Sequence, residues 1–407
     1  MSVSITINPG QGNDLFFKTG QISFSELRDK FTDDQSNFGN QISASQLRRN
    51  TDVQAANPIV PDATDNEQIS TSSNLTISQF RNSVKRYLAT QSGTDDNSSI
   101  NGPGFRMGLY DSNGRGLDFD GGGVNGRDGT NGNSTGNHTK NVQKLVSITG
   151  TCGSSRPGQP AALLSSLVTV HNFRITVSGY ILGYGGRGGG TSGAPSISGE
   201  NGYIALNLGS TGYNNSVIVG SAARIYGGGG GGEKGTTGSN GSSARCVKSE
   251  TFRSGCQQGS NSCPGGWNQT AHWQHCCQTR RGCAANHWYK VCEQSYNTST
   301  PIGGTGGNGG PGRGYNYQSG SRSGVSGGSR QCPSCAGGYS QQGGACSSAG
   351  ETGGTGGDWG DNGGNTNNTG NGGSTGAAIA RSSGSTNYSI SGTTNSSTIK
   401  GSITATV

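Results

Sequence analysis

Charged residues and large apolar side chains are both scarce in this chain. Only 13% of its 407 residues are charged, and all apolar and aromatic types other than glycine and proline make up 28%. No continuous apolar run approaches the length of a transmembrane helix. This shortage excludes a large side-chain core, so a chain of this length must pack in some other way or stay disordered.

The charge that is present is too sparse for binding nucleic acid. The 29 basic and 22 acidic residues give a net charge of +7 without dense basic clusters, whereas phosphate neutralisation needs basic residues gathered on one face. The first residues have neither the basic nor the apolar stretch of a secretory signal. We therefore expect no nucleic-acid partner, no membrane insertion and no signal peptide.

Residues for catalysis are also missing. The five histidines are scattered, and none forms a convincing nucleophile–base pair or a His-Glu-x-x-His motif. Asp118 and Asp120 have a spacing that could bind a cation on a strand, but a solvated turn before three glycines is the favoured interpretation. The sequence predicts a protein that is not an enzyme and has no cofactor or bound metal.

Glycine is abundant, with 78 residues where average usage would give about 28. Gly-Gly-x triplets run through 303–311 and 353–358. A polyproline II-type helix has three residues per turn and no internal hydrogen bonds, so two glycines per turn would let parallel rods approach and bond to one another. Collagen, suggested by Gly-X-Y triplets at 123–132, and flexible linkers are the alternatives. The number of tracts and the strands between them favour polyglycine II rods.

Strand-like runs alternate with the glycine tracts between 101 and 245. Phe173–Val177 and Tyr203–Leu208 alternate at period two. Two runs open into glycine, after Tyr184 and after Tyr226, which suggests a repeated strand-plus-glycine unit and a solenoid-like or layered all-β structure. The predicted fold class is mainly β with extended polyglycine II helices, short helices in the N-terminal segment and a disulfide-rich loop insert. The predicted regions are 1–100, 101–245 and 246–407, with the insert at 246–346.

A short phrase recurs three times in the first 100 residues, at 21–28, at 41–48 and, more loosely, at 75–81. Each copy places serine before an apolar turn, where its hydroxyl can cap a short amphipathic helix. One interpretation is a segment that docks on a partner; the other is a small helical subdomain. The candidate docking residues are Ile22, Phe24, Leu27, Ile42, Leu47, Ile77 and Phe80.

Ten of the eleven cysteines fall between 246 and 346, and Cys152 lies apart. An even number of cysteines in a segment with little core favours a disulfide framework. Zinc is the rival, because Cys332 and Cys335 have finger-like spacing, and free thiols are the third possibility. The connectivity is left open. The candidate structural cysteines are Cys246, Cys256, Cys263, Cys276, Cys277, Cys283, Cys292, Cys332, Cys335 and Cys346.

The same insert gathers three of the four tryptophans together with basic residues. Aromatic faces and guanidinium groups on stapled loops suit sugar rings, anionic sugars or protein surfaces. The alternative is that the tryptophans form a small core of the insert itself and that the two arginines are solvated. The candidate recognition residues are Trp267, Trp273, Arg280, Arg281, Trp288 and Tyr289.

The order of strand, glycine tract, variable insert and further glycine triplets resembles phage tail-fibre and receptor-binding proteins, above all the glycine-rich distal tail-fibre adhesins of T-even-type phages. The resemblance covers about 175–380 and rests on Tyr184–Gly190, Ile225–Gly228, Gly303–Gly307, Gly356–Gly360 and Gly372–Ile379. The phrase in the first 100 residues is also similar to segments in structural proteins of tailed phages. The long front region and the cysteine-rich insert depart from the T-even pattern.

The resemblance implies a non-enzymatic virion protein of the tail, assembled in the host cytoplasm, in which a polyglycine II scaffold displays loops to a host surface receptor. That receptor would be a glycan or an outer-membrane protein, and the N-terminal segment would contact other virion proteins. A purely structural decoration or connector protein of the capsid or tail is the alternative; a secreted glycine-rich matrix protein is disfavoured. Fibres are commonly trimers, so a homotrimer and a single-chain bundle both stay open.

Overall fold

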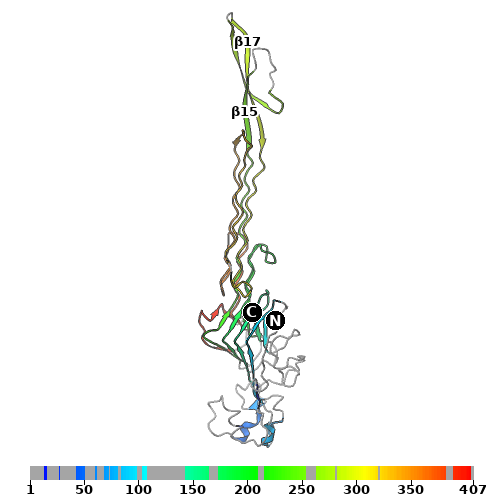
Figure 1. Ribbon diagram of the computed structural model, residues 1–407, viewed down its shortest axis with the longest axis vertical. Coiled ribbons are helices and arrows are strands. Elements are labelled where there is room, and N and C mark those ends of the chain that lie inside the picture. Colours follow the sequence, from blue (N-terminus) through cyan, green and yellow to red (C-terminus); the bar gives the residue numbers. More distant parts are fainter. Residues whose placement is uncertain are drawn as a thin grey trace.

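The computed structural model describes residues 13–15, 27, 43–50, 60–61, 68–72, 74–80, 84–98, 103–107, 143–164, 173–209, 215–253, 263–279, 282–319, 321–381 and 388–404. Within them the secondary structure is mainly β, as predicted. The molecule is elongated: stacked sheets form its base, glycine-rich segments rise from the base, and a small sheet lies at the far end (Figure 1). Among the described residues, no helix combines the length and apolar character needed to cross a membrane.

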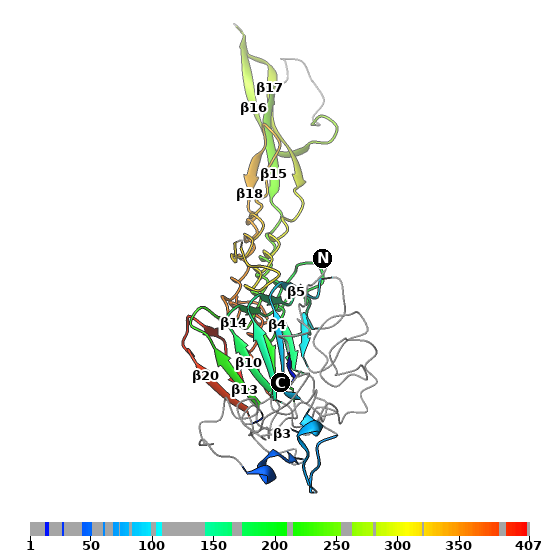
Figure 2. The same ribbon diagram turned by 60° about the horizontal axis from the view of Figure 1, so that its bottom comes forward.

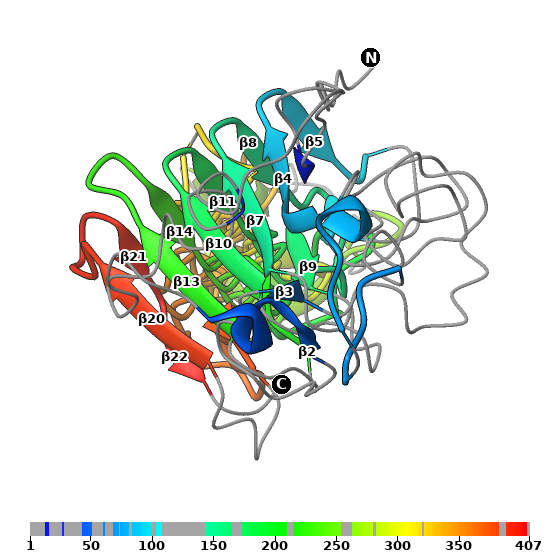
Figure 3. The ribbon, with the colours of Figure 1, turned by 90° about the horizontal axis from the view of Figure 1, so that it is seen from below.

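The base is a three-sided parallel β-helix in which one strand from each of three sheets makes one rung. Its first sheet pairs β4, β7, β10, β13 and β20, its second β5, β8, β11, β14 and β21, and its third β6, β9, β12, β19 and β22. Figure 3 shows the strands of successive rungs side by side. The antiparallel strand β1 (Asn13–Leu15) adds to the edge of β4.

Five rungs contribute to these sheets. The first has β4 (Val84–Gln91), β5 (Thr94–Asp96) and β6 (Phe105–Met107). The second has β7 (Gln143–Ile148), β8 (Thr151–Gly153) and β9 (Ala162–Leu164). The third has β10 (Phe173–Val177), β11 (Tyr180–Leu182) and β12 (Leu206–Asn207). The fourth has β13 (Asn215–Val219), β14 (Arg224–Tyr226) and β19 (Ile379–Ala380), and the fifth β20 (Tyr388–Gly392), β21 (Ile399–Lys400) and β22 (Ile403–Thr404).

Inward-facing β-branched residues stack from rung to rung to form the core. In the second sheet Ile181 pairs with Cys152 on one side and Ile225 on the other, and all three are fully buried. The alternation in β10 and β13 puts Ile175 opposite Val217 inside the β-helix. A solenoid therefore needs few apolar residues, because each rung contributes a handful and its neighbours bury them.

Two long excursions leave the β-helix at the same corner, between its second and third sheets. The first occupies 183–205, between β11 and β12, and the second 227–378, between β14 and β19. The repeated strand-plus-glycine unit is thus present in consecutive rungs, but its register pairs Tyr226 with Leu182 and not with Tyr184. Strands from both sides of the predicted boundaries at 100 and 245 join the same sheets.

The glycine-rich segments bond to one another at every third residue. In the central segment, defined as 227–242, the backbone N–H groups of Gly229, Gly232 and Gly235 donate to Arg313, Gly310 and Gly307. One residue before each of these, the N–H groups of a second set that includes Gly231 donate to carbonyls within 197–203. The N–H groups of the third set donate to carbonyls within 361–364. Three different neighbours thus satisfy one segment without any bonds inside it, which explains how its buried backbone groups are paired.

Several glycines of this bundle have no room for a side chain. A Cβ added at Gly231 would collide with the carbonyl oxygen of Arg187, and one at Gly230 with that of Gly373. Glycine is therefore required by close backbone approach at these positions. The bundle replaces a side-chain core with backbone packing.

The front region forms a small cluster with its own buried residues. It contains the 3-10 helices η1 (Ala44–Leu47) and η3 (Ile77–Phe80) and the short parallel pair β2 (Arg49–Asn50) and β3 (Val60–Pro61). The expected amphipathic helices are single 3-10 turns at the second and third copies of the phrase, and Leu27 of the first copy is α-helical.

Candidate functional site: the distal sheet

A four-stranded antiparallel sheet lies at the end of the glycine segments, far from the β-helix (Figure 2). Its order is β16–β17–β15–β18. The bounds are β15 (Arg245–Arg253), β16 (Asn268–Thr279), β17 (Gly282–Asn297) and β18 (Ser340–Gln342). β15, β16 and β17 follow one another along the chain, whereas β18 comes from a second pass of the chain to the tip, so two separate loops meet on one sheet.

In the part of the insert that the structure describes, three disulfides tie these strands and loops together. They join Cys246 to Cys335, Cys263 to Cys292, and Cys332 to Cys346. The prediction of a disulfide framework is confirmed for these six residues, and the zinc alternative for Cys332 and Cys335 is wrong because each pairs elsewhere. The side chains of Cys256, Cys276, Cys277 and Cys283 lie outside the described part of the chain. Cys152 is a buried free thiol in β8, and burial in the core raises its pKa.

Trp267, one of the predicted recognition residues, packs at the junction of a loop and the sheet. Its ring meets Phe252 edge-on, with centroids 5.8 Å apart, and Lys248 Nζ lies 5.6 Å from the ring centroid. Lys248 also forms an ion pair of 2.6 Å with Glu250. Trp267 is half-buried, so it serves the insert's own packing while one part stays in contact with solvent.

The other recognition candidates lie on or beside the long hairpin β16–β17. The backbone register pairs Trp273 with Tyr289 and Gln274 with Trp288, and the Tyr289 side chain is half-buried. The side chains of Trp273 and Trp288 lie outside the described part of the chain, and so do Arg280 and Arg281, which come between β16 and β17 in the sequence. The register thus brings three of the predicted aromatic residues to adjacent positions on paired strands.

A tyrosine pair that sequence reasoning missed fixes the second loop to the sheet. Tyr296 of β17 and Tyr339 meet edge-on with centroids 5.1 Å apart. The Tyr339 hydroxyl donates to Gln294 Oε1 at 2.6 Å, and the Tyr296 hydroxyl accepts from the backbone N–H of Ala336 at 2.7 Å. Tyr339 lies more than forty residues away in sequence, and no local pattern points to the pair.

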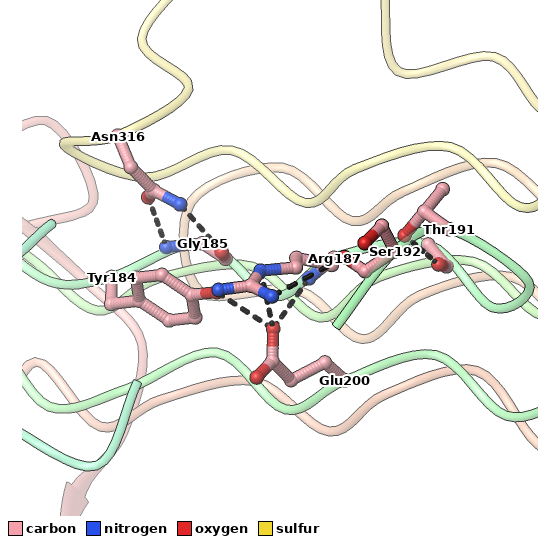
Figure 4. Close-up of polar contacts among 8 residues, drawn as sticks. Tyr184, Gly185, Arg187, Thr191, Ser192, Glu200 and Asn316 are labelled. Atoms are coloured by element: carbon pink, nitrogen blue, oxygen red, sulfur yellow. Dashed lines mark hydrogen bonds and ion pairs between the residues drawn. The ribbon is translucent and has the colours of Figure 1, made fainter. Parts of the chain in front are cut away.

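A polar network secures the base of the bundle where it leaves the β-helix (Figure 4). The Tyr184 hydroxyl donates to Glu200 Oε2 at 2.7 Å, the Arg187 N–H donates to the same oxygen at 3.1 Å, and Arg187 Nε lies 3.7 Å from it. Asn316 donates to the Gly185 carbonyl and accepts from the Gly185 N–H. Burial and the Glu200 carboxylate raise the pKa of Tyr184 well above its usual range.

Tyr315 links the returning glycine segment to the first rung of the β-helix. Its hydroxyl donates to Asp96 Oδ2 at 3.1 Å, and its ring would be struck by a Cβ at Gly153. Burial and the Asp96 charge raise the pKa of Tyr315 to about 12. The neutral phenol is therefore the form that the folded protein favours.

We expect Tyr315 to make the protein labile to alkali. Because its pKa is raised in the folded state, its contribution is complete below pH 10 and is lost as the pH rises through about 12. The free energy of unfolding should fall more steeply between pH 10 and 12 in the wild type than in Tyr315→Phe. Urea unfolding at stepped pH measures this, with Tyr317→Phe at a neighbouring tyrosine as the control. Equal slopes in wild type and Tyr315→Phe would contradict the expectation.

The predicted docking residues divide between buried and exposed positions. Leu27, Leu47 and Phe80 are at most 1% exposed and pack together with Val60 and Ile69. Ile77 is 43% exposed. The burial favours the alternative of a small subdomain with its own core for these three residues and leaves Ile77 as the described candidate at the surface. Ile22, Phe24 and Ile42, and likewise Asp118 and Asp120, lie outside the described residues.

In comparisons with known proteins, no family model, curated protein or solved structure matches this chain. Within the described residues, no group of three or more His, Cys, Asp and Glu side chains is placed to hold a metal ion.

Proposed function

We propose that this protein is a tail-fibre or tail-tip adhesin of a phage, which presents the distal sheet to a receptor on the host surface. The observation that supports it is the separation of a small, stapled, aromatic-bearing sheet from its β-helical base by a bundle of glycine segments. A stalk of this kind packs without a core of apolar side chains, and it holds the distal sheet away from the base. Cross-linked loops bind with little loss of conformational freedom.

We further propose that the glycine segments are polyglycine II helices. Bonding to a different neighbour at each of three successive residues, repeated along the central segment, is what a helix of three residues per turn requires. The hydrogen bonds of the central segment close within one chain, which favours a single-chain bundle over a homotrimer. Light scattering of the purified protein tests this choice directly.

In the proposed virion the β-helix and front region face other tail proteins, with the exposed Ile77 on the docking side. The receptor would be a glycan or an outer-membrane protein, and no chemical step is involved. A connector or decoration protein with no receptor is the second candidate. The same stalk would suit this role, with the distal sheet binding another virion protein instead of a host receptor.

Competition for adsorption tests the receptor role. We expect the purified full-length protein to block attachment of the parent virions to host cells. Arg280→Ala/Arg281→Ala, between β16 and β17 in the sequence, should weaken the block at least tenfold, because guanidinium groups are frequent interface anchors. Arg174→Ala, an exposed arginine on β10, is the matched control and should block like the wild type.

Undiminished attachment at saturating wild-type protein would contradict the adhesin and favour the connector. Equal blocking by the double variant and the control would leave the adhesin standing but remove the two arginines from its site. Release of sugar from purified host glycan by the pure protein would overturn the non-enzymatic part of the proposal.

A further inference from the structure

The two ends of the β-helix differ in how their last rung is covered. At the first rung, Asp95 of β5 and Phe105 of β6 are buried, and the antiparallel strand β1 pairs with the outer edge of β4. At the fifth rung, β20, β21 and β22 are each the outermost described strand of their sheet. Figure 3 shows these three strands at one end of the stack and β4 and β5 at the other. Among the described residues, one end is therefore closed and the other is open.

The apolar columns of the core become exposed at the fifth rung. In the third sheet Leu206 and Ile379 are 0% exposed, whereas Ile403 is 45% exposed. Ile403 pairs with Ile379 and ends this column. The columns of the first and second sheets end at Ile390 and Ile399, which are only half-buried. The terminal repeats of a solenoid normally have a polar outer face, but here the core ends in three isoleucines.

The backbone of the fifth rung also has an open side. In a parallel ladder, the N–H and C=O groups of a strand bond to neighbours on both of its sides. β20 pairs with β13 on one side, and no described strand lies on the other. The same holds for β21 beyond β14 and for β22 beyond β19. Three strand edges at one level are therefore available for pairing with another chain.

This edge lacks the usual protection against such pairing. Soluble proteins guard exposed strand edges with charged residues or proline. Residues 388–404 contain no proline, no acidic residue and a single basic residue, Lys400. Lys400 Nζ lies 5.3 Å from the ring centroid of Tyr226, so this charge is held over the neighbouring strand of the fourth rung. Ser389 and Ser391 of β20 are small, uncharged and exposed.

We propose that a second copy of this chain covers the open rung, 388–404, so that two chains form a dimer about a two-fold axis. A strand edge that meets its own copy across such an axis pairs antiparallel, the more stable arrangement. An almost uncharged edge meets itself without opposing like charges, and it offers a strongly charged partner little to recognise. Because β1 covers the edge of β4 at the other end, the chains close into a dimer instead of extending head to tail.

The dimer joins the bases and leaves each glycine bundle as it is, since the hydrogen bonds of the central segment close within one chain. It carries two distal sheets, so binding to a surface can use two contacts at once. The interface does not depend on what the distal sheet binds. Failure of the adhesin proposal would therefore leave the dimer standing, and the two are tested separately.

Light scattering of the full-length protein over a range of concentrations tests the dimer. The wild type should approach twice the 41.3 kDa mass of one chain. Ile403→Asp should raise the dissociation constant by at least about a hundredfold, because a two-fold interface contains the substitution twice and each carboxylate faces an apolar edge. Ile302→Asp is the matched control: it makes the same change at an exposed isoleucine of a glycine segment, and the dimer should persist.

Ser391→Lys is a second variant that leaves the core unchanged. It adds a charge at an exposed position of β20 and should weaken the dimer at least about tenfold. It decides the question should Ile403→Asp fail to fold. Hydrogen exchange locates the interface: amides in 388–404 should exchange more slowly in the concentrated wild type than in the dilute protein, and those in 301–313 should not change.

A wild type that stays monomeric at every concentration overturns the proposal and would mean that another segment of this chain, or a different protein, covers the rung. A mass of three chains overturns it as well. So does a dimer that survives both Ser391→Lys and a folded Ile403→Asp, or one whose slowed amides lie outside 388–404.

Discussion

Gly231→Ala should destabilise the protein by more than about 3 kcal/mol, at the upper end of what overpacking costs. Gly231 N–H donates to Glu200 and its carbonyl accepts from Gly373, while the space for a methyl group is taken by the carbonyl of Arg187. The segments would have to move apart, and each lost hydrogen bond would leave a buried backbone group unpaired. Urea unfolding followed by circular dichroism measures the change.

The matched control is Gly337→Ala, where an added Cβ meets no atom within 4 Å. It should change the free energy of unfolding by no more than about 0.5 kcal/mol. Hydrogen exchange in 228–233 should quicken in Gly231→Ala and stay unchanged in the control. A loss below about 1 kcal/mol in Gly231→Ala would mean that the segments are not packed backbone to backbone, and the polyglycine II proposal would fall with it.

Ile181→Ala should cost about 2–5 kcal/mol, the range for deleting most of a buried aliphatic side chain. Ile181 is 0% exposed in the second sheet of the β-helix, between Cys152 and Ile225. Each rung contributes few apolar residues, so neighbouring rungs have little material with which to fill the cavity. Both long excursions start from this sheet, and we expect the bundle to loosen along with the base.

Ile302→Ala makes the same chemical change on the glycine segment at 301–313, where Ile302 is 68% exposed. We expect a change within about 0.5 kcal/mol. Thermal unfolding of the two variants beside the wild type makes the comparison. Similar losses from both substitutions would argue against a core inside the β-helix.

Local patterns in the sequence predicted much of the β-helix. The alternation in Phe173–Val177 is present in β10, because one side of the strand faces a core and the other faces solvent. Glycine triplets likewise predicted extended, closely approaching segments. The disulfide framework followed from cysteine density, since a polar insert with little core needs cross-links.

The candidate site was less predictable. Which cysteines pair depends on the second pass of the chain to the tip, and that pass sets Cys335 beside Cys246 across 89 residues. The same second pass of the chain brings Tyr339 beside Tyr296. In the front region, Leu27, Leu47 and Phe80 have the sequence of an exposed docking face yet pack on one another, because an apolar repeat does not itself say whether its partner is another chain or another copy of the repeat.

The sequence by itself determined that this protein would be rich in β-structure, would lack a large side-chain core and would rely on glycine and cysteine instead. Those properties follow from the composition and from patterns that repeat every two or three residues, which involve only residues close together in the sequence. Only the tertiary structure decided that the strands stack as rungs, that both glycine excursions rise from one corner, and that the aromatic hairpin ends far from the base. Such choices depend on contacts between residues tens to hundreds of positions apart, for which no local pattern carries the information.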